Sequence, residues 1–137
     1  MKCPCDYDAR RFFLFGMRIF FGIWLLNLGL TKWFKMGAGD FVGMITEQFD
    51  RPKTWSPHAL NVGLAWIILV AEPVLAVLIL TGIKPRVIWS LTALLMFQLL
   101  LGQSLLGKDM FPNWGYTVLT LVCAALSQPA REETMVA

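Results

Sequence analysis

Charge is scarce in this chain, and that scarcity narrows the class of protein before any motif is considered. Only 15% of the 137 residues are charged, against about 25% in soluble domains, while 57% are hydrophobic. The chain has too little polar surface to coat a soluble globule of its size, so lipid is the expected solvent. The net charge of +3 is also too small and too dispersed for a nucleic-acid surface.

Cysteine and histidine are scarce too, which removes the common metal and redox sites. Cys3 and Cys5 form a CPC motif, but nothing nearby completes a four-ligand metal site. We interpret them as ordinary reduced thiols, with a metal or a lipid anchor as the alternative. Cys123 reads as a small packing residue, and the single histidine, His58, has no second one to share a haem. We expect no metal, no covalently bound cofactor and no catalytic residue that can be assigned.

Long apolar runs are what the sequence does contain. A helix needs about 20 mostly apolar residues to cross a hydrocarbon core of about 30 Å. We predict four membrane-spanning helices, at residues 12–30, 60–80, 87–106 and 111–126. The predicted fold class is all-α: an integral membrane four-helix bundle that forms one domain over residues 1–137.

The long first connection, residues 31–59, has a pattern of its own. Apolar residues recur there at helical spacing, namely Phe41, Met44, Ile45 and Phe49. This predicts a short amphipathic helix over about 40–49, started by Asp40, that lies on the outer membrane surface or caps the bundle.

Basic residues near the span ends predict the orientation. Six lysines and arginines fall on the side of the N-terminus and five on the opposite side. The Arg10-Arg11 pair and the Lys84-Pro85-Arg86 turn both abut helices on the side with six. We therefore predict a multi-pass protein of the inner or plasma membrane with both termini in the cytoplasm.

Two ionisable side chains fall inside the predicted spans, where a charge costs about 2.5–3.5 kcal/mol on insertion scales. Arg18 shares a helix face with Gly22, Gly29 and Lys32, and Glu72 lies on a face of small residues. Their depths match in antiparallel helices, so we predict that Arg18 and Glu72 lie within salt-bridge or one-water distance of each other. Such a pair either fixes helix register or lines a polar pocket, together with Lys32, for a redox headgroup or a proton.

Neutral polar residues and a proline interrupt the spans as well. Asn27 and Gln103 match in depth, which predicts an interhelical hydrogen bond worth about 0.6 kcal/mol. Gln98 lies near mid-membrane and is placed to join the Arg18–Glu72 group as a binding residue. Pro73 lacks an N–H and frees one backbone carbonyl nearby.

Taken together, these residues resemble a known family. Short motifs follow one another across the four helices, namely Arg18, GLTKW at 29–33, Glu72, LTG at 80–82, Arg86 and Asn113-Trp114. Their order and spacing resemble the DoxX family over about residues 12–126. The chain departs where many relatives carry a histidine and an acidic residue, because Gln103-Ser104 and Gly115 stand at these places.

The resemblance implies a four-helix membrane protein linked to redox systems. Relatives include the small subunit of a thiosulfate:quinone oxidoreductase and partners in membrane-associated thiol-redox complexes. The resemblance thus implies an accessory subunit of a redox complex, with other membrane subunits as partners. A quinone headgroup is the candidate ligand, since quinone carbonyls accept hydrogen bonds from donors such as Arg18 and Lys32. Because the chain has no redox-active centre of its own, we expect no catalysis without a partner.

Two further classes remain open. A non-catalytic scaffold subunit that stabilises a larger membrane assembly is supported by the small-residue faces and the lack of catalytic residue types. A transporter of a small solute is the weaker alternative, because four helices enclose a narrow pore at best.

Overall fold

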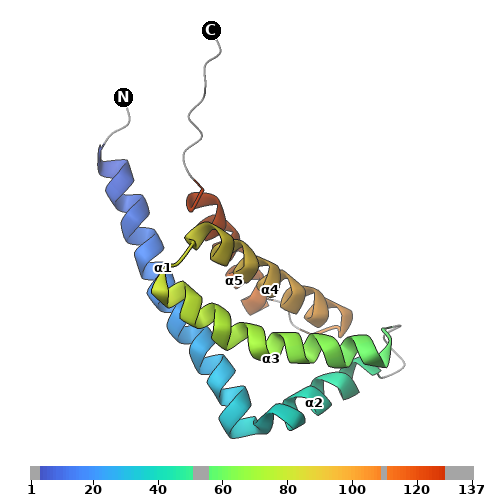
Figure 1. The fold of residues 1–137 in the computed structure, drawn as a ribbon. Helices are drawn as coiled ribbons and strands as arrows, with labels where there is room; N and C mark the ends of the chain where they lie inside the picture. The colour runs from blue at the N-terminus through green and yellow to red at the C-terminus, as the bar shows by residue number, and fades with distance from the viewer. Residues whose placement is uncertain (1–3, 51–55, 109–110, 129–137) are drawn as a thin grey trace.

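Helices alone make up the described part of the chain, which in this computed structural model comprises residues 4–50, 56–108 and 111–128. In chain order they are α1 (Pro4–Leu30), the π-helical η1 (Thr31–Gly37), α2 (Ala38–Asp50), α3 (His58–Thr81), α4 (Pro85–Leu105) and α5 (Phe111–Leu126) (Figure 1). Among these residues there is no strand, so the predicted all-α class is confirmed.

Three stretches of the described chain are helical, apolar and long enough to cross a membrane: Asp8–Asp50, α3 and α4. Large apolar side chains face outward along all three, and Phe12, Ile67 and Leu94 are 81%, 56% and 63% exposed. Water would penalise so much exposed apolar surface, whereas lipid does not. The chain is thus a multi-pass membrane protein. Helix α5 is shorter, with 16 residues, and its role as a fourth span stays a prediction.

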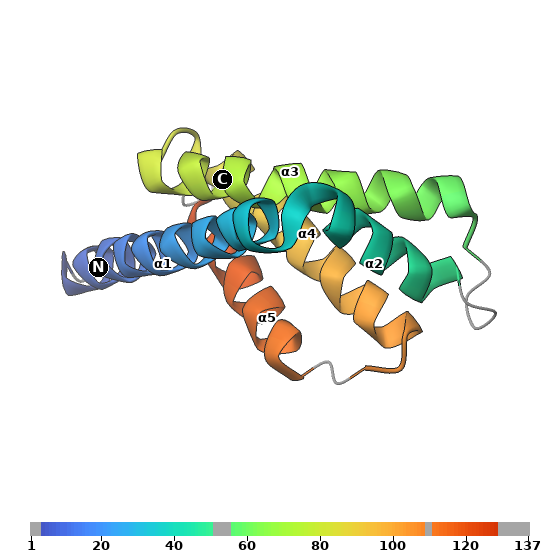
Figure 2. The same cartoon turned by 90° about the horizontal axis from the view of Figure 1, so that it is seen from below.

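The helices associate in two groups (Figures 1 and 2). Helix α1 packs along α3, and α2 turns back to lie on α3 as well, while α4 packs mainly against α5. Phe21 of α1 links the groups, because its ring makes edge-to-face contacts with Trp89 of α4 and Tyr116 of α5 at 5.8 and 6.2 Å between centroids. The buried core therefore draws on both groups.

The predicted amphipathic helix is present as α2. Phe41 and Val42 are buried on one side, and Ile45 is half-buried. Met44, which was predicted to share the apolar face, is instead exposed on the same side as Asp40. The chain bends between η1 and α2 at Gly37, whose φ of +88° a glycine adopts at little cost (Figure 1). This bend directs α2 back along α3.

The turn between α3 and α4 is tight. Gly82 ends α3 in the left-handed conformation, with its N–H donating to the carbonyls of Leu78 and Ile79. Lys84 is also left-handed, with φ of 42°, and Pro85 then opens α4 at a position where its missing N–H costs nothing. The turn leaves the carbonyl of Leu80 without a backbone partner inside α3.

Candidate functional site

Two glycines let α1 approach α3 closely. A Cβ added to Gly22 would lie 2.5 Å from Leu80 Cδ2, and one on Gly29 would lie 2.9 Å from Pro73 Cδ. Both glycines are buried, which confirms that the face of α1 carrying Arg18 packs inward. The contacts are seven residues apart on each helix, so together they set the antiparallel register.

A buried ion pair lies one turn beyond Gly29. Nζ of Lys32, in η1, donates to Oε1 and Oε2 of Glu72 at 2.5 and 2.6 Å. The side chain of Glu72 is 1% exposed and that of Lys32 is 19% exposed. The same Nζ lies 4.8 Å from the centre of the Phe41 ring on α2. The pair thus joins η1, α3 and α2, and it can be reached from the Lys32 side.

Trp33 donates a hydrogen bond to a backbone carbonyl of α3 that lacks its helical donor. Pro73 has no N–H, so the carbonyl of Leu69, four residues earlier, lacks its usual helical donor. The indole Nε1 of Trp33 donates to that oxygen at 3.1 Å. Sequence reasoning found the freed carbonyl but missed Trp33 as its partner, although GLTKW placed this residue next to Lys32.

The predicted salt bridge between Arg18 and Glu72 is wrong. The Arg18 guanidinium donates from Nε and Nη2 to the backbone oxygen of Leu80, at 3.2 and 2.7 Å, and packs against Gly82. Leu80 lies eight residues from Glu72, about 12 Å along the helix axis. Depths counted from the ends of the apolar runs failed because the glycine contacts fix the register, and they place Lys32 opposite Glu72.

The neutral polar residues do not meet as predicted. Asn27 is exposed, because it lies about 200° around α1 from the buried Leu25. Oε1 of Gln103 is buried without a hydrogen-bond partner among the described residues. The expected Asn27–Gln103 bond is therefore wrong. Gln98 is half-buried, and no hydrogen bond within the described chain joins it to Arg18 or Glu72.

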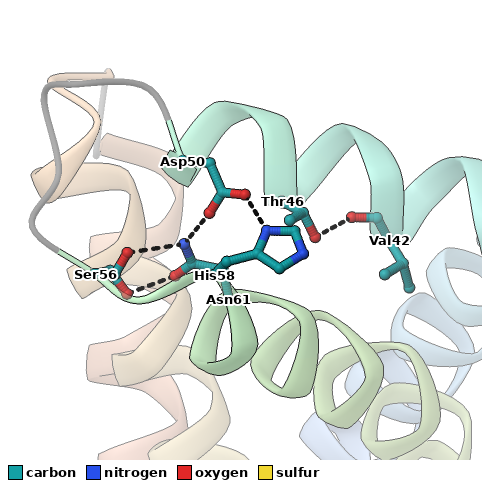
Figure 3. A network of polar contacts seen from close by, with 6 residues as sticks. All are labelled: Val42, Thr46, Asp50, Ser56, His58 and Asn61. Carbon is teal, nitrogen blue, oxygen red and sulfur yellow. Dashed lines mark hydrogen bonds and ion pairs between the residues drawn. The ribbon is translucent and has the colours of Figure 1, made fainter.

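A second polar cluster ties the end of α2 to the start of α3 (Figure 3). Nδ2 of Asn61 donates to Oδ1 of Asp50 at 2.6 Å, and Oγ of Ser56 donates to Oδ1 of Asn61 at 2.5 Å. The His58 ring contacts the other Asp50 oxygen through Nδ1. The hydrogen bond with His58, and then that with Asn61, lowers the pKa of the Asp50 carboxyl below its usual value. Sequence reasoning missed this cluster, since Asp50 and Asn61 lie in different predicted elements.

An open groove of about 770 Å³ runs beside this cluster between α2 and α3. Its lining is Gly39, Val42, Gly43, Thr46, Glu47, Asp50, His58 and Val62. Neither Lys32 nor Glu72 lines it, so the groove is separate from the buried ion pair. In the part of the chain that the structure describes, no three His, Cys, Asp or Glu side chains gather as metal ligands. Cys3 lies outside the described residues, as does the side chain of Cys5.

Apolar spans, a glycine-packed helix pair and a charged pair enclosed between them define a polytopic α-helical membrane protein. The DoxX family matches residues 13–103, well over half of the chain. The chain belongs to the DoxX family. The match includes Arg18, Lys32 and Glu72 and ends within α4, so that α5 lies outside it. No curated protein and no solved structure matches the chain.

Proposed function

We propose that this DoxX-family protein is an integral membrane accessory subunit of a redox complex, with the Lys32–Glu72 pair as its polar site. One observation carries the proposal: the charged pair lies between two apolar helical segments that both depart from regular α-helical hydrogen bonding. Lys32 lies in the π-helical η1, and Glu72 precedes Pro73 in α3. π-Helical turns occur frequently at functional sites. Ionisable residues inside membrane spans commonly mark proton paths or ligand counter-ions.

A quinone headgroup is the ligand that we propose for this site. The Lys32 ammonium has three N–H donors, of which Glu72 takes two, so one donor is left for a carbonyl oxygen. Arg18, expected to bind the second carbonyl, is instead engaged with Leu80. The residues thus fit one quinone carbonyl. Bound there, a quinone would supply the reversible two-electron chemistry.

The chain's own side chains would hold and orient such a ligand. Glu72 fixes the position of the Lys32 Nζ and balances its charge inside the apolar helices. Trp33, which is 40% exposed, holds η1 against α3 through the Leu69 carbonyl. Electrons would pass to or from a partner subunit.

A scaffold subunit is the second candidate function, and one feature of the ion pair favours it. Both oxygens of Glu72 are hydrogen-bonded by Lys32, and the carboxylate is almost fully buried. A carboxylate that is already fully hydrogen-bonded supports a structural role, in which the pair locks η1 onto α3. Replacing both partners by apolar residues of similar size would then preserve the assembly, since paired apolar replacements of buried ion pairs are often neutral or stabilising.

Purification of matched variants in mild detergent distinguishes the two functions. The double variant Lys32→Met/Glu72→Leu removes the polar site and strands no charge, whereas Lys35→Met removes an exposed charge from the same segment, η1. Mass spectrometry then quantifies the quinone and the redox subunits that co-purify.

The redox proposal expects quinone and a redox subunit with the native chain and with Lys35→Met, and loss of quinone from the double variant. A double variant that keeps a fully active assembly establishes the scaffold instead. Absence of both quinone and redox subunits from the native preparation rejects the redox role.

We further propose that both termini are cytoplasmic. Arg10 of α1 and Arg86 of α4 both reach Gln128, two residues beyond α5, so these basic residues gather at the end of the molecule where α1 begins and α5 ends (Figure 1). An impermeant maleimide added outside cells should label Lys108→Cys but not Lys84→Cys, in a background with Cys3 and Cys5 replaced by serine. The opposite labelling pattern rejects this orientation.

A further inference from the structure

Two arginines from different helices meet at Gln128, two residues after the end of α5. Nη2 of Arg10 donates to the backbone oxygen of Gln128 at 2.6 Å and also to that of Leu126. Nη2 of Arg86 donates to the side-chain Oε1 of Gln128 at 2.9 Å. The two guanidinium groups, far apart in the sequence, therefore lie on either side of one amide residue.

Every acceptor in these contacts is neutral. Backbone and amide oxygens orient the Arg10 and Arg86 guanidinium groups but do not cancel their charges. Lys84, exposed in the adjoining turn, adds a third positive charge at this end. The Lys32–Glu72 pair, in contrast, lies at the other end of the α1–α3 contact. Positive charge is thus concentrated and fixed in position around Gln128.

Outward-facing apolar side chains adjoin these charges in sequence. Val87 is 51% exposed next to Arg86. Ile83, beside Lys84, is 56% exposed. The surface therefore combines fixed cations with apolar side chains that face acyl chains.

We propose that Arg10, Lys84 and Arg86 form a binding site for the headgroup of an anionic phospholipid, called here the headgroup site. A guanidinium matches the oxygens of a phosphate in a bidentate geometry, and basic clusters at span ends attract anionic lipids. Each arginine still has N–H donors beyond those used by Gln128 and Leu126. The phosphate binds these cations while the acyl chains pack on Ile83 and Val87. This lipid site is independent of the proposed redox role.

Lipid nanodiscs test the headgroup site with the full chain. Discs of phosphatidylcholine alone and discs with added phosphatidylglycerol are compared, and native mass spectrometry measures the retained phosphatidylglycerol. Each basic residue near a membrane surface is worth roughly fivefold in affinity, so Arg10→Gln/Arg86→Gln should lose roughly 10- to 30-fold. The matched control Lys35→Gln/Lys108→Gln removes the same charge elsewhere and should bind like the native chain.

Gln128→Glu keeps the test decisive if loss of Arg10 disturbs folding. The new carboxylate keeps an acceptor for Arg86, the backbone oxygen that accepts from Arg10 is unchanged, and the site gains a negative charge. It should abolish the preference for phosphatidylglycerol while circular dichroism stays unchanged. Full retention of the preference in this variant overturns the proposal, as does an equal loss in the Lys35→Gln/Lys108→Gln control.

Inorganic phosphate separates a lipid from a free anion as the occupant. The site requires the acyl chains, so millimolar inorganic phosphate should leave phosphatidylglycerol bound. Displacement by phosphate at that concentration identifies a free-anion site and overturns the lipid proposal.

Discussion

Arg18 and Lys32 lie on one face of the first helical stretch, yet they end in different electrostatic environments. Lys32 meets the carboxylate of Glu72 in a buried pair. Arg18 is half-buried and donates to a neutral carbonyl, that of Leu80, which lies in the last turn of α3 and lacks a helical donor. Steric contact at Gly22 and Gly29 fixes the register of α1 against α3. This register determines which acceptor lies within hydrogen-bond distance of Arg18 and which lies within that distance of Lys32.

A pair of double-mutant cycles tests whether Glu72 is coupled to Lys32 and not to Arg18. Glu72→Leu strands the charge of Lys32 and should lower the free energy of unfolding by about 3–5 kcal/mol, whereas Lys32→Met/Glu72→Leu should lose far less. Combining Glu72→Leu with Arg18→Met should be additive within about 0.5 kcal/mol, because these side chains share no partner. Unfolding in detergent measures both cycles. Strong coupling of Arg18 to Glu72 would show that they interact after all.

Alanine at the glycines tests whether packing fixes the register. Gly29→Ala places a Cβ against the rigid ring and backbone of Pro73 and should destabilise by about 1–3 kcal/mol. Gly22→Ala meets only the flexible side chain of Leu80 and should cost less. Gly16→Ala, with no atom within 4 Å of the added Cβ, is the control and should not destabilise. Equal losses at all three positions in thermal unfolding contradict this explanation.

Removal of the Trp33 donor should have no larger effect than alanine at Gly29. Trp33→Phe leaves the Leu69 carbonyl unpaired and should cost about 1–3 kcal/mol in the free energy of unfolding. In a Pro73→Ala background the alanine N–H can donate to Leu69, so the same change should cost less. Trp66→Phe, at a ring 42% exposed on α3, serves as the control. A cost that does not depend on Pro73 would mean that the indole acts through packing alone.

The smallest expected effect concerns the cluster of Asp50, His58 and Asn61 at the C-terminal end of α2. The pKa of Asp50 is lowered, so its hydrogen bonds contribute fully above the ordinary carboxyl pKa of 3.8 and are lost as the pH falls through the lowered value. The tie between α2 and α3 should therefore be constant near neutral pH. Carbon-13 NMR titration should show the Asp50 pKa rising toward 3.8 in His58→Ala, and less in Asn61→Ala. An unchanged pKa in both variants would contradict this origin of the shift.

The features that could be predicted from the sequence are those encoded locally. Apolar length indicated the helices, and the spacing of Gly22 and Gly29 indicated the packed face of α1, because helical periodicity determines which residues share a face. The partner of Glu72 could not be predicted this way. It depends on contacts between residues distant in the sequence, and on a π-helical segment that apolar periodicity does not reveal. The missing Asn27–Gln103 pair has a local cause instead, because Asn27 lies about 200° around α1 from the buried Leu25.

The distance in sequence between the charges and their partners has a consequence for biosynthesis. Glu72, the partner of Lys32, comes 40 residues later in the chain, and Leu80, whose carbonyl accepts from Arg18, comes 62 residues after that arginine. During translation, α1 therefore reaches the translocon before either partner has been made. A lone arginine at a helix centre costs about 2.5–3.5 kcal/mol on insertion. We expect α1 to remain beside the translocon until α3 emerges, so that the unit released into the bilayer is the paired assembly from α1 to α3.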